Sequence, residues 1–440
     1  MNIFFVSLGC DKNRVDSERM LGLLEGAGFS FAQTEEGADI IIINTCCFID
    51  AAKEESINTI LEMAQYKEEG RCTKLIVCGC LAERYKKEIK EELPEVDEIV
   101  GVNELPDIIR ACAQLSDDEE AFPETPAEPE QLKRVVTTGG HYEFLKIAEG
   151  CSKRCTYCII PYIRGPYTSF DMEGLLSEAE SLAAAGVKEL VVVAQETTLY
   201  GRDLYGKVML PALLEKLCEI EGLRWIRLLY AYPEDITDAL LDVMAAEEKI
   251  VKYIDMPIQH ASDSVLKRMG RKTGRADIAA IIDKARKKIP GLCIRTSLIT
   301  GFPGETEEDF EILCDFVKET KFDRLGTFTY SCEEGTPAAS FKDQVPDEVK
   351  TERREEIMRL QQEISAKKNA ALKGKTFEVF VEGYIPEDDI YVGRTYMDSP
   401  DVDSYFYFES AFDLMSGDFV LARVTEAGEY DLFGEMTEKL

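Results

Sequence analysis

The chain has 440 residues, of which 45% are hydrophobic, and its 84 Asp and Glu against 51 Lys and Arg give a formal net charge of −33. Such an acidic surface repels phosphate backbones and favours basic partners, so we do not expect direct nucleic-acid binding. Solubility alone is the other explanation of the charge. No apolar run reaches the roughly 20 residues that span a bilayer, and the first residues lack the features of a secretion signal. We therefore expect a cytoplasmic protein without a membrane partner, folded into about two to four domains.

Cysteine is frequent and histidine is rare, with 14 and 2 residues respectively. In a long chain without a secretion signal, cysteines are expected to bind metals or to be buried rather than to form disulfides. Two histidines argue against a His-rich zinc enzyme and against a Ser-His-Asp hydrolase. The cysteines are therefore the first candidates for a reactive site.

Apolar strands alternate with helices up to about residue 114, which predicts an α/β domain with a doubly wound parallel sheet at residues 1–114. The expected strands are Asn2–Gly9, Asp39–Thr45, Lys74–Gly79 and Val96–Val102, with helices over Asn13–Ala27 and Ala51–Tyr66. Residues 115–136 are acidic and rich in proline, without apolar periodicity. That composition predicts a linker.

A second alternation of strands and helices occupies residues 137–372 and predicts a partial (βα)6 barrel of the TIM type. The expected strands are Phe144–Ala148, Glu189–Gln195, Trp225–Tyr230, Tyr253–Pro257, Cys293–Thr300 and Asp323–Tyr330, and helices are expected over Met172–Ala185, Asp309–Thr320 and Asp347–Leu372. We expect the functional site at the carboxyl ends of these strands, where barrels of this type build their sites.

Residues 373–440 contain short aromatic and β-branched stretches, which predict a small antiparallel β-barrel. From Lys375 to Leu440 there are 16 Asp and Glu against 4 Lys and Arg, a net charge of −12. A module with this charge is suited to a basic protein rather than to a nucleic acid. The alternative is a module that only keeps the chain soluble.

Cys151, Cys155 and Cys158 follow the first strand of the predicted barrel with the spacing C-x3-C-x2-C. Three thiolates on one loop can bind three irons of a 4Fe-4S cluster and leave the fourth iron open. Structural zinc and a ferredoxin cluster are the alternatives, but each takes four protein ligands, and no fourth Cys or His is close in the sequence. The spacing, with Tyr157 before the third cysteine, resembles the radical-SAM superfamily, in which S-adenosylmethionine (SAM) chelates the open iron.

Cys10, Cys46 and Cys80 each follow a predicted strand of the first domain. Parallel strands end at one edge of a sheet, where open α/β sheets build their sites, so these cysteines are expected to converge. They predict a second cluster with one open iron. The alternative is that they are small buried side chains. That is the expectation for the other eight cysteines, namely Cys47, Cys72, Cys78, Cys112, Cys218, Cys293, Cys314 and Cys332.

Two three-cysteine sets, one before a barrel and one opening it, followed by a small β domain, resemble the radical-SAM methylthiotransferase family along nearly the whole chain. In that family the N-terminal cluster handles sulfur, the barrel cluster cleaves SAM, and the last module is called TRAM. One branch modifies adenosine in tRNA, and another modifies an aspartate of small-subunit ribosomal protein twelve.

Five stretches resemble the ribosomal-protein branch: SLGCDKNRVDSE (Ser7–Glu18), NTCCFIDAAKEESI (Asn44–Ile57), KIAEGCSKRCTYCIIPYIRG (146–165), DMPIQHAS (Asp255–Ser262) and GRTYMDSPDVD (Gly393–Asp403). Two positions depart from the family pattern. Glu196 stands where an aspartate is expected, and Cys332 stands where a proline is expected. Both departures leave the resemblance intact.

The resemblance implies transfer of a methylthio group to the β-carbon of that aspartate, with two 4Fe-4S clusters and SAM as cofactors and no catalytic residue beyond the cluster ligands. One SAM would methylate sulfur on the first cluster, and a second would supply the radical that removes the unactivated Cβ–H hydrogen. The substrate would be a basic ribosomal protein, and flavodoxin or ferredoxin would supply electrons. The alternatives are methylthiolation of tRNA adenosine and, outside the enzymes, an electron carrier or iron–sulfur scaffold.

Six candidates for contact with SAM lie beside the barrel cysteines or in strands that border the expected site: Tyr157, Gln195, Glu196, Arg295, Gly301 and Glu305. Arg295 is suited to the SAM carboxylate, and the glycines of GFPGE permit a close backbone approach. A plain turn with Glu305 near a helix N-terminus is the alternative for GFPGE. His260, after another strand, is either a pocket residue or a buried core histidine.

Overall fold

A computed structural model describes residues 1–113 and 134–440, and the chain divides into two compact units. The first unit contains Met1–Thr137, Glu149–Lys153 and Cys158–Thr168, and the second contains Thr138–Ala148, Arg154–Tyr157 and Ser169–Leu440. The linker predicted at 115–136 lies outside the described residues except for 134–136. Within the described ranges, no helix has the length and apolar character needed to cross a membrane.

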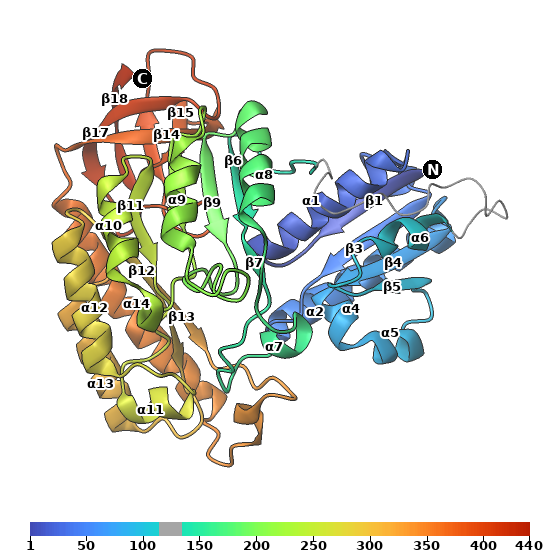
Figure 1. Ribbon diagram of the computed structural model, residues 1–440, viewed down its shortest axis with the longest axis horizontal. Helices are drawn as coiled ribbons and strands as arrows, with labels where there is room; N and C mark the ends of the chain where they lie inside the picture. The colour runs from blue at the N-terminus through green and yellow to red at the C-terminus, as the bar shows by residue number, and fades with distance from the viewer. Residues whose placement is uncertain (114–133) are drawn as a thin grey trace. The chain divides into compact units, whose positions relative to one another are not determined.

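A five-stranded parallel sheet forms the centre of the first unit, in the order β2-β1-β3-β4-β5 (Figure 1). Its strands are β1 (Asn2–Ser7), β2 (Ser30–Phe31), β3 (Ile40–Thr45), β4 (Lys74–Gly79) and β5 (Glu98–Val100). Every residue of β3 and β4 is buried, as expected for apolar strands covered on both faces. The edge strand β2 was not predicted, because two residues are too few to show a pattern.

Helices cover both faces of this sheet, which confirms the doubly wound prediction. One face packs against α1 (Asp11–Gly26) and α6 (Asp107–Ala113). The other face packs against α2 (Asp50–Ala64), α4 (Cys80–Arg84), α5 (Lys86–Glu92) and the short α7 (Ile160–Ile163). The remaining short elements of the unit are the 3-10 turn η1 (Glu35–Gly37) and α3 (Tyr66–Glu69).

Gly79 ends β4 and lets the chain turn directly into α4. Its φ is +90°, and a β-carbon there would lie 2.2 Å from the Asn44 side-chain oxygen and 2.6 Å from the Thr45 carbonyl oxygen. Only glycine avoids both the backbone strain and the collision. The turn therefore fixes where Cys80, the first residue of α4, leaves the sheet.

A six-stranded parallel sheet forms the core of the second unit, in the order β13-β12-β11-β10-β9-β6 (Figure 1). The strands are β6 (Tyr142–Lys146), β9 (Glu189–Val193), β10 (Trp225–Leu228), β11 (Ile250–Asp255), β12 (Cys293–Thr300) and β13 (Arg324–Thr329). Neighbouring strands follow one another along the chain, and the sheet stays open between β6 and β13. This arrangement confirms the partial (βα)6 barrel.

Helices connect these strands as the alternation predicted. They are α8 (Met172–Ala184), α9 (Leu210–Glu219), α10 (Asp238–Ala246), α11 (Asp263–Arg268), α12 (Arg275–Lys288), α13 (Glu307–Thr320) and α14 (Asp347–Ala370). Short elements are β7 (Ala148–Glu149), β8 (Thr168–Ser169), η3 (Pro233–Asp235) and η4 (Pro337–Ser340). Thr306 begins α13 with a reciprocal cap, in which its hydroxyl accepts from Asp309 N and the Asp309 carboxylate accepts from Thr306 N.

The last part of the second unit is a closed barrel in the order β14-β15-β16-β18-β17. Its strands are β14 (Thr376–Ile385), β15 (Ile390–Arg394), β16 (Phe406–Glu409), β17 (Phe419–Ala427) and β18 (Leu432–Lys439). Four of the strand pairs are antiparallel, as predicted, whereas β16 and β18 are parallel. Closure of the barrel removes the exposed edges that a small sheet would otherwise present.

Buried charges join this small barrel to the six-stranded sheet. Glu189, at the start of β9, accepts from Arg227 Nε at 2.7 Å and from Arg394 Nη2 at 2.6 Å. All three side chains are at most 1% exposed. Burial raises the pKa of Glu189, but the charges of Arg394 and Arg227 outweigh it and leave that pKa below its usual value.

The segment between β15 and β16, residues 395–405, covers the amino ends of the sheet strands. Asp398 pairs with Arg324 at 2.5 Å, and Asp403 accepts from the Tyr253 hydroxyl at 2.6 Å. Arg227 also donates to the Tyr396 carbonyl at 2.8 Å. These contacts fill the amino end of the partial barrel and leave the carboxyl end for other partners.

Replacing Glu189 by Gln should lower the free energy of unfolding of the second unit by about 3–5 kcal/mol, because buried Arg227 loses its counter-ion and buried Arg394 keeps only Glu382. The matched control is Glu378→Gln, which breaks the partly exposed Arg224–Glu378 pair between the same two sheets and should cost less than about 1 kcal/mol. Urea unfolding at neutral pH measures both changes. Equal losses would contradict the role given to Glu189.

The difference in stability between the parent protein and the Glu189→Gln variant should depend on pH. The folded pKa of Glu189 is depressed, so its contribution is complete above the unfolded value of about 4.3 and disappears as pH falls through the lower folded value. The stability difference between parent and Glu189→Gln should therefore shrink below about pH 4. A difference that grows in acid would contradict the depressed pKa.

Replacing Gly79 by Ala should destabilise the first unit by about 1–3 kcal/mol, because alanine is strained at this backbone conformation and collides with Asn44 and Thr45. Gly26→Ala, at the end of α1, is the control. Its φ is not positive, and a β-carbon there meets nothing within 4 Å. It should be neutral or stabilising by up to about 1 kcal/mol. The urea unfolding midpoints of the two variants measure these changes in stability.

Candidate functional site

The first set of predicted cluster ligands comes together at one edge of the first sheet. Cys10, Cys46 and Cys80 follow β1, β3 and β4, which are neighbours in the strand order. Gly9, with φ +91°, lies so close to Cys46 that a β-carbon would be 2.8 Å from the Cys46 β-carbon and 3.1 Å from its sulfur. The turn before Cys10 therefore packs directly on the Cys46 side chain.

The thiols of this set affect one another electrostatically. Burial raises the pKa of the Cys46 thiol, and the Cys10 sulfur nearby raises it further. Burial also raises the pKa of Cys80, where the charge of Arg164 opposes the shift and the sulfurs of Cys10 and Cys46 add to it. Cys10 is exposed, whereas Cys46 and Cys80 are 7% and 6% exposed. Such thiols become thiolates only next to positive charge or a metal.

Asn13, in the first turn of α1, connects the cysteine-bearing turns. Its side-chain nitrogen donates to the Leu8 carbonyl at 2.8 Å and to the Thr45 carbonyl at 3.0 Å. Leu8 lies two residues before Cys10, and Thr45 immediately precedes Cys46. One amide thus holds two of the three cysteine segments at a fixed separation.

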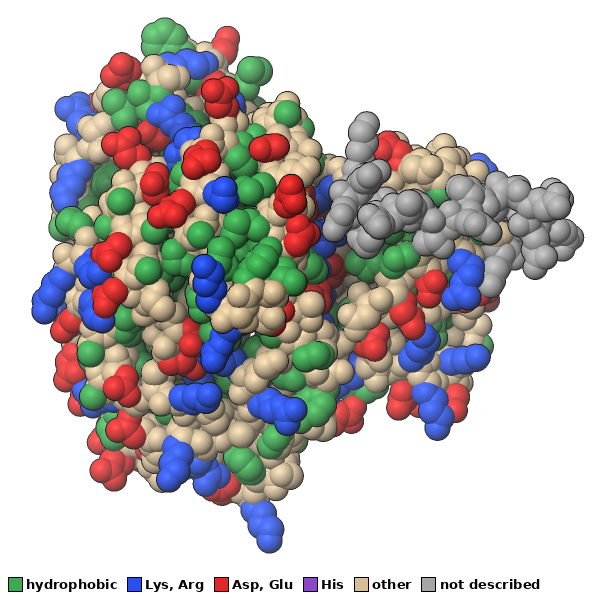
Figure 2. Space-filling view, in the orientation of Figure 1, with side chains coloured by type: hydrophobic (Ala, Val, Ile, Leu, Met, Phe, Trp, Pro, Cys, Tyr) green, Lys and Arg blue, Asp and Glu red, His purple; other side chains and the backbone are tan. Residues whose placement is uncertain are grey.

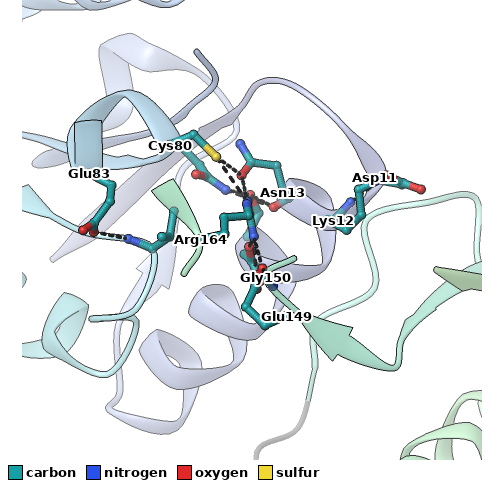
Figure 3. A network of polar contacts seen from close by, with 12 residues as sticks. Asp11, Lys12, Asn13, Cys80, Glu83, Glu149, Gly150 and Arg164 are labelled. Carbon is teal, nitrogen blue, oxygen red and sulfur yellow. Dashed lines mark hydrogen bonds and ion pairs between the residues drawn. The ribbon is translucent and has the colours of Figure 1, made fainter. Parts of the chain in front are cut away.

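Arg164 lies beside the third cysteine (Figure 3). Its Nη2 donates to the Asn13 side-chain oxygen at 2.7 Å and lies 3.4 Å from the Cys80 sulfur. Its Nη1 pairs with Asp16 at 2.9 Å and with both oxygens of Glu149 at 3.1 Å. The side chain is 1% exposed, so its charge acts in a region with little water.

The second set, Cys151, Cys155 and Cys158, occupies one short loop after β7. Cys151 and Cys158 belong to the first unit and Cys155 to the second. Cys151 N donates to the Gly165 carbonyl at 3.1 Å. Next to Cys155, Arg154 takes a positive φ of 55°, and Thr156 N donates to the Met269 carbonyl at 2.9 Å.

Cys155 lies near Tyr232, which follows β10, and Arg271, which follows α11. Its sulfur is 3.9 Å from the Tyr232 hydroxyl, which comes after β10. Arg271 stacks on the Tyr232 ring with its Cζ 4.4 Å from the centroid, and donates from Nη2 to the Pro257 carbonyl at 3.1 Å. Within the described residues, its buried Nε and Nη1 have no hydrogen-bond partner. A bound anionic group near Cys155 would satisfy them.

Three of the predicted SAM contacts lie at the carboxyl ends of the sheet strands or next to the cysteines. Tyr157 packs against an apolar cluster that includes Phe302 and Tyr330. Gln195 and Glu196 follow β9. Glu196 is fully buried, and its carboxylate accepts from Thr198 N at 2.8 Å and from the Thr198 hydroxyl.

Gly301 and Glu305 form a tightly determined turn after β12. One oxygen of Glu305 accepts from Gly301 N at 2.9 Å, and the other accepts from Arg353 at 2.9 Å. A β-carbon on Gly301 would be 2.1 Å from the Lys350 side chain, so the close approach that this glycine permits is that of α14. His260 is fully buried, with Nε2 3.5 Å from Glu305. The contacts of Gly301 and Glu305 favour a structural turn, whereas the buried His260 Nε2 has no hydrogen-bond partner within the described residues.

Arg295 is not brought together with the other candidates. It lies near the amino end of β12, about 20 Å along the chain from Gly301 at roughly 3.3 Å per residue. Its guanidinium pairs with Asp255 at 2.8 Å and with Asp403, before β16, at 3.4 Å. In this structure it holds the terminal barrel to the sheet.

Each cysteine set would bind separate irons of a cluster rather than one metal ion. Among the residues that the structure describes, no three His, Cys, Asp or Glu side chains are grouped so that they could hold one metal ion. Cysteines that bind separate irons of a cluster need not meet at one point. The other cysteines are buried as expected, except that Cys218 is half-buried and Cys332 is exposed in the loop after β13.

Sequence reasoning missed Asn13, Arg164, Tyr232 and Arg271. Asn13 and Arg164 do lie within stretches that carried the family resemblance, three residues after Cys10 and six after Cys158. No local pattern shows that the two side chains meet, because 151 positions separate them. Tyr232 follows β10 and Arg271 follows α11, and neither carries a local sequence signal.

Family models match three segments of the chain. Residues 2–101 match the uncharacterized protein family UPF0004, residues 145–317 match the radical SAM superfamily, and residues 374–437 match the TRAM domain. Among solved structures, the radical SAM methyltransferase TsrM from Kitasatospora setae covers 77% of this chain with a TM-score of 0.56, over 76% of its own length at 14% identity. This likeness shows a shared fold.

Full-length relatives are much more similar. Proteins named ribosomal protein uS12 methylthiotransferase RimO are 56% identical over 437 residues in Lachnoclostridium phytofermentans and 51% identical over 441 residues in Acetivibrio thermocellus. The first match covers 99% of both chains, and the second covers 98% of this chain and 97% of the relative. The chain therefore belongs to the radical SAM methylthiotransferase family, in the group whose members are named RimO.

Proposed function

We propose that the protein transfers a methylthio group to the β-carbon of an aspartate in ribosomal protein uS12. The observation that carries this proposal is the convergence of Cys10, Cys46 and Cys80 on one sheet edge, in addition to the loop of Cys151, Cys155 and Cys158. One three-cysteine set is sufficient to cleave SAM, and a sulfur-inserting enzyme needs a second place to hold sulfur. Full-length relatives carry the name of this activity.

The cofactors in this proposal are two 4Fe-4S clusters, one on each cysteine set, and SAM. When bound, they supply the sulfur and the carbon radical that removes the unactivated Cβ–H hydrogen of aspartate. The protein residues hold and orient these groups. Arg164 and Asn13 fix the first cysteine set, and Tyr232 and Arg271 border Cys155.

For SAM itself, we propose contacts by Tyr157, Gln195 and Glu196, which lie beside Cys155 in sequence or after β9. Gly301 and Glu305 shape the turn at the same edge, with both carboxylate oxygens of Glu305 already used. Arg295 pairs with two aspartates at the other end of β12 and is the weakest of the six candidates.

The partners that we propose are the basic substrate protein and an external one-electron donor such as flavodoxin or ferredoxin. The net charge of −33 supports a basic protein substrate over tRNA. Figure 2 shows acidic and basic side chains interspersed over one face, without a single acidic patch there. We further propose a cytoplasmic location, where cysteines that bind iron–sulfur clusters stay reduced.

Anaerobic reconstitution should load about eight irons per chain, four for each cluster. Replacing Cys10, Cys46 and Cys80 together by Ala should reduce this to about four and abolish methylthio transfer, while SAM cleavage persists. Replacing Cys151, Cys155 and Cys158 should also leave about four irons but abolish SAM cleavage. Iron and sulfide analysis with chromatography of 5′-deoxyadenosine measures these losses.

The matched control replaces Cys72, Cys78 and Cys112, three buried cysteines of the same unit outside the proposed set. This chain should keep about eight irons. About four irons in the parent would remove the second cluster from the proposal and leave radical cleavage of SAM standing.

With SAM, reductant and a sulfur source, a uS12 peptide should gain one methylthio group on an aspartate, as read by tandem mass spectrometry. A peptide with that aspartate replaced by alanine is the control. The rate of methylthio transfer should fall as the salt concentration rises from about 0.05 to about 0.5 M, because salt screens the attraction between an acidic enzyme and a basic substrate. Modified adenosine in tRNA, with an unmodified peptide, would favour the other branch of the family.

A further inference from the structure

Arg164 is a buried cation that contacts both a cysteine of the first set and two carboxylates. Its two terminal nitrogens divide these contacts between them. Nη2 faces the Cys80 sulfur at 3.4 Å and the Asn13 oxygen at 2.7 Å (Figure 3). Nη1 faces the carboxylates of Asp16 and Glu149. A purely structural arginine would need only the carboxylates.

The Nη2 side reaches all three cysteine segments of the first set. It contacts Cys80 directly, and through Asn13 it is linked to the carbonyl groups of Leu8 and Thr45, next to Cys10 and Cys46. An N–H group aimed at a cysteine sulfur, on a side chain that is 1% exposed, places positive charge where a cluster thiolate would be.

The Nη1 side reaches the loop that opens with Cys151. Glu149, its partner, also accepts from Gly150 N at 3.1 Å. Gly150, with φ +72°, packs on the backbone of the same segment, where a β-carbon would lie 2.4 Å from the Pro166 oxygen and 2.8 Å from the Arg164 oxygen. Glu149, the ion-pair partner of Arg164, therefore holds the backbone next to Cys151.

We propose that Arg164 is a positioning residue for both iron–sulfur sites: its contact with Cys80 raises the reduction potential of the cluster on Cys10, Cys46 and Cys80, and its pair with Glu149 fixes the start of the Cys151 loop. This inference rests on the proposed function, because it requires a cluster on the first set. Cluster potentials depend on net charge and on hydrogen bonds to sulfur. Positive charge at Cys80 stabilises the reduced cluster, which carries one more electron.

The test uses the full chain with Cys151, Cys155 and Cys158 replaced by Ala, so that only the first cluster is loaded. Potentiometric titration followed by electron paramagnetic resonance gives its midpoint. Arg164→Gln should lower the ratio of reduced to oxidised cluster about tenfold at the parent midpoint, a negative shift of about 59 mV for one electron. Arg164→Lys keeps the charge without the forked geometry, so its midpoint potential should lie between those of the parent and Arg164→Gln.

Glu149→Gln supplies a second, independent variant of opposite sign. It removes a negative charge next to Arg164 while its amide oxygen still accepts from Gly150 N, so the midpoint should shift in the positive direction. A role in folding alone does not predict opposite shifts from the two partners of one ion pair. If Arg164→Gln does not fold, Glu149→Gln and Arg164→Lys decide the outcome.

The control is Arg134→Gln, which removes another buried arginine of the first unit, paired with Glu18 at 2.6 Å, and should leave the midpoint unchanged. Iron and sulfide content and circular dichroism accompany each variant. A loaded cluster with the parent potential in the Arg164 and Glu149 variants would overturn this inference and leave the proposed function intact. A parent chain that binds no iron on the first set would overturn both.

Discussion

The arrangement of the first cysteine set depends on the side chain of Asn13. Its amide donates to two turns that precede Cys10 and Cys46, and its oxygen accepts from the arginine that faces Cys80. A parallel sheet places the three cysteines at one edge, but it does not fix their separation. A buried amide with every contact satisfied fixes that separation without adding charge.

The two ends of the six-stranded sheet have different tasks. Glu189, Arg227 and Arg394 fill its amino end with a buried ion network that attaches the terminal barrel. The carboxyl end carries the turns with Glu196, Tyr232 and Gly301, close in the fold to where the chemistry of such barrels takes place. Strong buried pairs suit a permanent attachment, because breaking one leaves an uncompensated charge.

Much of this architecture could be predicted from the sequence. Apolar runs such as Ile40–Thr45 and Cys293–Thr300 predict buried strands, and cysteines that follow such strands must share an edge. Charge pairing could not be predicted, since Glu189 and Arg394 are 205 positions apart and have no local pattern. The pairs of Arg295 with Asp255 and Asp403 could not be predicted either, because periodicity shows where a strand lies but not which charges meet across it.

The central claim is that the carbon attacked is the β-carbon of an aspartate, and deuterium transfer tests it most directly. A uS12 peptide with deuterium on that carbon is incubated with the reconstituted enzyme, SAM, reductant and a sulfur source, and the 5′-deoxyadenosine is analysed by mass spectrometry. Deuterium should appear in 5′-deoxyadenosine in proportion to the methylthiolated peptide. Methylthiolated peptide accompanied by unlabelled 5′-deoxyadenosine would contradict it.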